Sequence, residues 1–226
     1  MLDYVIRSGT VIDGTGEPGR LADIGIRDGR IVAIGQIDEE GTTEFDAGGL
    51  TVIPGVVDPH THYDAQLFWD PLASPSNVHG VTTVIGGNCG FTLAPINAED
   101  ADYIRQMMAK VEGMPLAALE NGVPWNWSTF GEYLDALDGR LGVNAGFLVG
   151  HCALRRKVMG AARGEEVATD DEVAAMRGLL ADSLAAGGLG FVIYGASTAW
   201  TLRPADSEAF DQSFDHAYDP DGATTG

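Results

Sequence analysis

Short apolar runs separated by turn residues fill the first fifty residues of the chain. The apolar runs are residues 4–6, 10–12, 23–26 and 31–34. The pairs between them include Ser8-Gly9, Asp13-Gly14 and Asp28-Gly29. An Asp-Gly pair between alternating apolar runs is a strong hairpin signal, because both residues accept the positive φ angles of a tight turn. The pattern therefore predicts a small β unit over residues 1–53.

From residue 54 onward the pattern changes to strands alternating with helices. Strands are predicted at residues 81–87, 143–149 and 189–194, and helices at 98–111, 129–137 and 169–186. The first helix is indicated by Ile104, Met107, Met108 and Val111, which recur at intervals of three and four residues. The last helix begins with a capping box, Thr169 to Glu172. This alternation predicts a parallel sheet with right-handed crossovers.

Two histidines follow the first apolar run of this second region. Residues 52–57 are β-branched apart from Pro54 and Gly55, which predicts a short strand buried on both faces. His60 and His62 come next, and in an extended chain the two-residue period points both imidazoles to one side. Two converging imidazoles form half of a divalent metal site and suit zinc best.

Other metal-type side chains follow the later predicted strands. Cys89 comes after the run at 81–87, and His151 after the run at 143–149. The carboxyl ends of parallel strands meet at one rim, where a (β/α)₈ barrel carries its active site. We interpret His79, Trp125 and Trp127 as packing or loop residues.

The charge balance excludes some classes of partner. The chain has 33 acidic and 13 basic residues, a net charge of −20, so it lacks the Lys/Arg stripes that nucleic acids and anionic membranes require. Met1 leads directly into the β pattern without the basic and apolar regions of a signal peptide, which favours the cytoplasm. Two cysteines, Cys89 and Cys152, make no disulfide framework.

Several motifs in a fixed order resemble the amidohydrolase superfamily, in its N-acyl-D-amino-acid deacylase (D-aminoacylase) branch. The resemblance extends over residues 3–191. The matching motifs are Pro54-Gly55-Val56-Val57-Asp58-Pro59, His60-Thr61-His62-Tyr63-Asp64-Ala65-Gln66, Gly87-Asn88-Cys89-Gly90-Phe91, Gly122-Val123-Pro124-Trp125-Asn126-Trp127 and Gly150-His151.

This resemblance implies a fold, a cofactor and a set of residue roles. It implies an α/β fold, an incomplete TIM-type (β/α) barrel preceded by a small β-sandwich segment. It also implies a Zn²⁺ centre to which His60, His62 and Cys89 contribute ligands. Asp58 and Asp64 flank the histidines, and each either orients a histidine or contacts the substrate, or is a solvated loop acid. His151 either reaches the substrate or is a structural histidine.

Some expected parts of the family's site find no match in this sequence. The remaining histidine ligands and the general-base aspartate of the family lie outside the matching motifs, so the catalytic residues stay unknown. We do not assign His216 to this role. Many other amidohydrolases bridge two metals with a lysine on the fourth strand, but Lys110 and Lys157 are predicted to lie outside strands. That difference favours the cysteine-type centre.

The length predicts an unfinished barrel. A barrel takes roughly 250 residues and eight strands, whereas residues 54–226 supply about 170 residues and about four strands. We expect residues 54–195 to form the first half of the barrel and residues 196–226 an acidic, divergent tail. The sequence is then interpreted as a truncated or frameshifted N-terminal half, inactive or nearly so.

The predicted family activity is hydrolysis of the linear amide of N-acyl-D-amino acids, which are small-molecule substrates. Two alternatives stay open. One is a cyclic-amide hydrolase of hydantoinase or dihydroorotase type, which a ring-opening assay would identify. The other is a non-catalytic fragment that binds metal and self-associates through an exposed barrel edge. The acyl group, the amino acid, the metal stoichiometry and the oligomeric state are not determined by the sequence.

Overall fold

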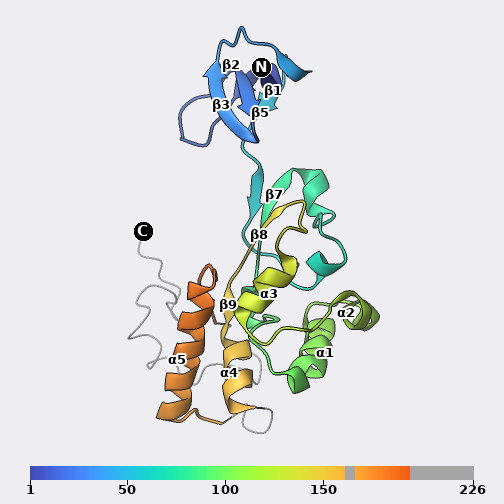
Figure 1. Cartoon of the computed structure of the whole chain (residues 1–226), viewed down its shortest axis with the longest axis vertical. Helices are drawn as coiled ribbons and strands as arrows, with labels where there is room; N and C mark the ends of the chain where they lie inside the picture. Colours follow the sequence, from blue (N-terminus) through green and yellow to red (C-terminus); the bar gives the residue numbers. More distant parts are fainter. Residues whose placement is uncertain (161–165, 194–226) are drawn as a thin grey trace. The chain divides into compact units, whose positions relative to one another are not determined.

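The structure is a computed structural model, and it describes residues 1–160 and 166–193. The chain divides into two compact units, Met1–Gly55 and Val56–Gly226, which are described separately (Figure 1). The predicted tail at 196–226, including His216, lies outside the described residues. Its interpretation, and the division at residues 53 and 195, stay predictions.

The first unit is a five-stranded sheet. Its strands are β1 (Leu2–Val11), β2 (Arg20–Arg27), β3 (Arg30–Gly35), β4 (Gly41–Asp46) and β5 (Thr51–Val52). The order is β3-β2-β1-β4, and β5 also pairs with β1. The predicted turn at Asp28-Gly29 joins β2 to β3, with φ angles of 52° and 69°. A small core contains Val11, Ala22 and Ile24.

One prediction for this unit was wrong. Residues 4–6 and 10–12 were expected to form two strands divided by Ser8-Gly9, but β1 is continuous through both. Ser8 has a φ of 60°, and the register with β2 shifts between Ile6 and Gly9. The pair forms an irregularity within the strand rather than a turn, because the flanking residues keep their β2 partners. Strand β4 was not predicted.

The second unit contains two short parallel sheets. The strands are β6 (Val56–Asp58), β7 (Val81–Gly86), β8 (Asn144–Phe147), β9 (Val149–Gly150) and β10 (Phe191–Val192). The order β6-β7-β8 is parallel throughout, and β9 pairs with β10 in parallel. The parallel strands and intervening helices confirm the predicted α/β class, with the barrel incomplete.

Helices connect these strands. The α-helices are α1 (Ala101–Val111), α2 (Leu116–Gly122), α3 (Phe130–Leu137), α4 (His151–Met159) and α5 (Asp170–Ala185). Single 3₁₀ turns are η1 (Gln66–Phe68), η2 (Ser76–His79), η3 (Asn88–Gly90) and η4 (Ala98–Asp100). The capping box predicted at Thr169 is present, and a second one begins α3 at Thr129. Helices α4 and α5 pack side by side (Figure 1).

An aromatic cluster fills the core of the second unit. The Tyr133 ring lies 5.2 Å from Trp127 and 5.1 Å from Phe147, both in edge-on geometry. The Trp127 indole donates to the Leu93 carbonyl at 2.8 Å, so its polar group is satisfied inside the core. This cluster joins α3 to β8 and accounts for Trp127 as a packing residue.

Two strand predictions for the second unit need correction. The run at 52–57 is not one strand buried on both faces, because β5 and β6 belong to different sheets and Val57 is 55% exposed. Pro54 has no N–H to donate, which interrupts the ladder there. The run at 143–149 also divides into two strands. Strand β8 pairs with β7, which ends at Gly86, and Val149 and Gly150 pair with β10 instead. Helices α2 and α4 were not predicted.

None of the helices in the described ranges is both long enough and apolar enough to cross a membrane.

Candidate metal centre

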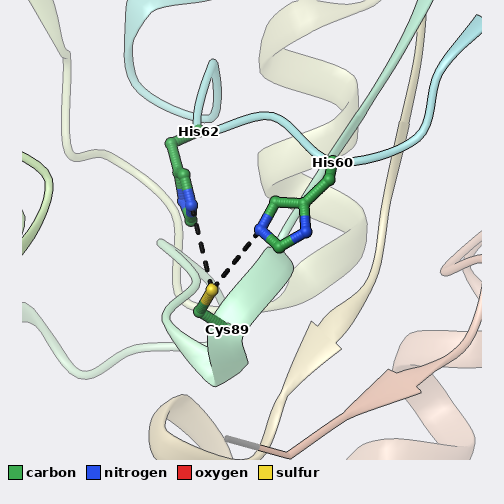
Figure 2. Close-up of side chains that lie close together, drawn as sticks. All are labelled: His60, His62 and Cys89. Carbon is green, nitrogen blue, oxygen red and sulfur yellow. Dashed lines mark hydrogen bonds between the residues drawn. The ribbon is translucent and has the colours of Figure 1, made fainter.

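Three side chains predicted as metal ligands converge at the ends of neighbouring strands. His60 and His62 lie in the segment after β6, and Cys89 lies in η3, directly after β7. The Cys89 Sγ is 3.5 Å from His60 Nε2 and 3.9 Å from His62 Nε2. Figure 2 shows both imidazoles directed at the sulfur. All three potential ligand atoms lie within 4.8 Å of one another.

A tight turn presents the Cys89 thiol to the histidines. Gly87 and Gly90 have φ angles of 80° and 75°, and Cys89 between them has a φ of 58°. A left-handed backbone costs a non-glycine residue roughly 1–2 kcal/mol, so surrounding structure must hold Cys89 in place. A side chain at Gly87 would overlap the backbone of Leu148. Glycine is therefore needed for the turn to pack against the segment after β8.

Hydrogen bonds tie the histidine segment to the end of β7. The backbone N–H and the hydroxyl of Thr61 both donate to the Ile85 carbonyl, each at 2.9 Å. The Asn88 side-chain amide donates to the same carbonyl at 2.9 Å and to the Thr61 carbonyl at 3.4 Å. These bonds fix the residue between the two histidines relative to the cysteine turn. They explain how an irregular segment can hold both imidazoles in a fixed position relative to the Cys89 thiol.

Asp64 forms a further link between the two ligand segments. Its carboxylate is buried and accepts from the Gly87 N–H at 2.8 Å, while Tyr133 donates to its backbone carbonyl at 3.1 Å. Burial raises the pKa of Asp64 to about 7. The side chain acts through the backbone of the cysteine turn, since its bond goes to Gly87 and not to an imidazole. Its predicted role in orienting a histidine or contacting the substrate stays a prediction.

The other two flanking candidates occupy different positions. Asp58 accepts from the His60 backbone N–H at 3.3 Å, so it orients the chain at His60. His151 is the first residue of α4 and is 1% exposed, with the Phe191 ring 6.1 Å away. Burial lowers the pKa of His151 to about 4. The roles predicted for Asp58 and His151 toward substrate stay predictions.

The electrostatics of the cluster suit a bound cation. Burial raises the pKa of the Cys89 thiol, and the nearby Glu112 carboxylate raises it further. Burial lowers the pKa of His62, against the opposite effect of Glu112, so a neutral imidazole is favoured. A divalent ion reverses the thiol's preference, because a coordinating thiol loses its proton.

The distances fit a tetrahedral zinc ion. Zn–N and Zn–S bonds of about 2.0 and 2.3 Å at the tetrahedral angle place nitrogen and sulfur about 3.5 Å apart. The separation of Cys89 Sγ from His60 Nε2 has this value, and His62 Nε2 is slightly farther away. Two imidazoles and one thiol are also among the donors that zinc prefers. The residues therefore fit the group that the sequence motifs imply.

Sequence reasoning missed one residue of this site, Glu112. Its Oε2 lies 3.3 Å from His62 Nε2, and its side chain is 13% exposed. It follows the last residue of α1, where the helix dipole disfavours a negative charge. An acid directly before Gly113 at a helix C-terminus was the available signal in the sequence, although it is a weak one.

The chain belongs to the amidohydrolase family. The family model described as "Amidohydrolase family" matches residues 43–220. A D-aminoacylase of Alcaligenes xylosoxydans xylosoxydans is 40% identical over 190 residues, which cover 83% of this chain and 37% of the relative. The resemblance read from the motifs is thereby confirmed.

Solved structures agree with this assignment. A structure of D-aminoacylase, from work on the functional role of its binuclear metal centre, matches with a TM-score of 0.76 and 37% identity over 92% of this chain and 42% of its own. The N-acyl-D-glutamate deacylase from Bordetella bronchiseptica, complexed with zinc and a phosphonate inhibitor, matches at 0.73 and 33% identity, covering 93% and 42%.

Cyclic-amide hydrolases are less similar. The L-hydantoinase of Arthrobacter aurescens has a TM-score of 0.56 and 19% identity, a likeness of fold alone. The deacylases are therefore the better match. This chain spans less than half the length of these deacylases.

Proposed function

We propose that this chain carries part of the metal centre of a zinc-dependent hydrolase that cleaves the linear amide of N-acyl-D-amino acids. The observation that carries the proposal is the convergence of His60 Nε2 and His62 Nε2 on Cys89 Sγ at the ends of β6 and β7. The similarity to deacylases supports the substrate class. The acyl group and the amino acid are left open, and a cytoplasmic location stays a prediction.

The chain's own residues would hold and orient the ion. His60, His62 and Cys89 supply three donors, and Thr61 and Asn88 fix the segments that carry them. A zinc ion with three protein ligands and an open fourth position would lower the pKa of a bound water to about 7 and polarise a carbonyl oxygen, which is the activation that amide hydrolysis needs. Asp64 keeps the cysteine turn in register through Gly87.

The residues that would complete catalysis are not among those described. Of the remaining histidines in the described ranges, His79 lies in η2 and His151 is buried at the start of α4. We propose no general base. The absence of a strand lysine still argues against the hydantoinase type, because Lys110 lies in α1 and Lys157 in α4.

Metal content tests the proposed site. We expect near-stoichiometric zinc in the purified chain and a loss of most of it in Cys89→Ala, because a thiolate ligand is removed. Cys152→Ala is the matched control, since Cys152 is the other free cysteine and is buried in α4. Emission spectroscopy on dialysed protein measures the result. Zinc that stays equal in all three proteins would contradict the assignment of Cys89.

An amide-hydrolysis assay tests the reaction class. We expect the zinc-loaded 226-residue chain to release D-amino acid from N-acetyl-D-amino acids very slowly or not at all, because the described residues supply only part of a catalytic site. Release by this chain at enzyme-like rates would contradict that expectation. Ring opening of a hydantoin, with no deacylation, would favour the cyclic-amide alternative.

A further inference from the structure

Glu112 occupies an unusual position beside the candidate metal centre. Helix α1 ends at Val111, and the Glu112 backbone N–H closes the last turn on the Met108 carbonyl at 3.0 Å. Gly113, with a φ of 67°, then turns the chain away. The result is a carboxylate held at the helix end with its Oε2 3.3 Å from His62 Nε2.

The surroundings of this carboxylate do not supply an obvious counter-charge. A helix C-terminus disfavours an anion by about 0.3–1 kcal/mol, and partial burial removes hydration as well. Within residues 1–160 and 166–193, its one ion pair is with His62, an imidazole that carries no permanent charge. By contrast, the buried carboxylate of Asp100 pairs with Arg156 at 2.6 Å. Glu112 therefore lacks the permanently charged partner that Asp100 has.

We propose that Glu112 is a fourth protein ligand of the metal held by His60, His62 and Cys89, an inference that rests on the proposed metal site. Nitrogen and oxygen ligands at about 2.0–2.2 Å from a tetrahedral ion lie about 3.4 Å apart. The separation of Glu112 Oε2 from His62 Nε2 is close to this value. Glu112 lies outside the group of three whose ligand atoms are within 4.8 Å of one another, so coordination requires its carboxylate to move from the His62 side toward the ion.

The charges of the complete set also balance. Two neutral imidazoles, one thiolate and one carboxylate carry a total of two negative charges, which a divalent ion neutralises. Four protein ligands are typical of sites that retain their metal firmly. With Glu112 bound, the ion in this chain has no open position for water, which agrees with the slow or absent hydrolysis expected of it. The fourth donor is at the end of helix α1, and no metal-binding motif in the sequence indicates this helix.

Two substitutions at Glu112 distinguish a carboxylate that coordinates the ion from one that acts only as a distant charge. Glu112→Gln keeps the shape of the side chain but removes the anionic oxygen. Glu112→Asp keeps the charge but withdraws the carboxylate by one carbon–carbon bond, about 1.5 Å. Glu120→Gln in α2, an exposed position, is the matched control. Metal affinity is measured by competition with a chromophoric chelator for Zn²⁺, and ligand geometry by the d–d absorption of bound Co²⁺.

We expect both Glu112 variants to bind Zn²⁺ at least about 10-fold more weakly and to shift the Co²⁺ bands, while Glu120→Gln matches the wild type. Metal-free stability, measured by thermal unfolding, should be unchanged or higher in the variants, because an unfavourable charge at the helix end has been removed or moved. A variant that merely damaged the fold would instead have a lower metal-free stability than the wild type.

Other results would overturn the inference. Unchanged affinity in either variant, or unchanged Co²⁺ bands, would show that Glu112 does not coordinate the ion. If wild-type zinc falls in Cys89→Ala but not in the Glu112 variants, the proposed site stands and only the fourth ligand fails. If the wild-type chain binds no metal at all, both the site and the role of Glu112 fail together.

Discussion

At the scale of single residues, the candidate site depends on neighbours that act through the backbone. Asp64 does not bond to an imidazole, yet it fixes the turn that carries Cys89 by accepting from Gly87. Asn88 and Thr61 share the Ile85 carbonyl and so join the two ligand segments. The motifs therefore contain two kinds of residue, those that can bind a metal and those that hold the first kind in place.

His151 leads to a prediction of pH dependence. Its pKa is lowered from 6.5 to about 4 by burial, so the unfolded chain binds a proton in this range that the folded chain excludes. The contribution is fully present above pH 6.5 and is lost as pH falls toward 4. We expect the free energy of unfolding to fall by up to about 1.4 kcal/mol per pH unit from this group.

Urea unfolding followed by tryptophan fluorescence between pH 7 and pH 4.5 measures this effect. His151→Gln should remove this part of the slope, and His79→Gln, at an exposed position in η2, should leave it unchanged. Parallel slopes in the wild type and His151→Gln would show that burial does not prevent protonation of this histidine.

At the scale of elements, the turn from β7 into η3 is the feature that the site needs most. Three of its residues, Gly87, Cys89 and Gly90, have left-handed backbone angles, and the turn packs against the segment between β8 and β9. The insertion or deletion of one residue in this turn would move the Cys89 thiol away from both histidines. The strands themselves are short and supply mainly the positions of their ends.

Gly87→Ala tests this turn. The new methyl group would meet the Leu148 backbone, and the positive φ is unfavourable for alanine, so we expect a loss of about 2–4 kcal/mol in stability together with weaker zinc binding. Gly139→Ala is the control, because Gly139 has a φ of 69° but open space around it and should lose only about 1 kcal/mol. Similar losses in both variants, measured by chemical unfolding, would refute the packing argument.

At the scale of the whole molecule, the larger parallel sheet of the second unit is open within the described residues. The order β6-β7-β8 leaves β6 and β8 at its edges, and Val56 and Val57 on β6 are 42% and 55% exposed. Unpaired edges with apolar side chains favour association between chains. The net charge of −20 opposes that association, and salt screens the repulsion over about 8–10 Å at physiological ionic strength.

We therefore expect the molecular mass from light scattering to rise with protein concentration and with added salt. Val57→Lys places a charge on the edge strand and should reduce the rise, whereas Val78→Lys, at an exposed position in η2, is the control. A monomer mass that stays constant under all these conditions would contradict self-association through this edge.

The sequence by itself determined the α/β class, most helices and strands, and the three candidate metal ligands. These features are written in local patterns: apolar spacing for the helix α1, a capping box for α5, and metal-type residues placed directly after apolar strands. The two-residue period was the wrong reason for the convergence of His60 and His62, since they lie in an irregular segment, although the convergence itself is present.

Only the tertiary structure decided where the strands divide and which distant groups meet. Whether residues 52–57 form one strand depends on the partners available to each residue, and β5 and β6 have partners in different sheets. The approach of Glu112 to His62 joins residues fifty positions apart, and the bond from Gly87 to Asp64 joins two separate motifs. Such contacts arise from the packing of whole elements, which local apolar patterns do not encode.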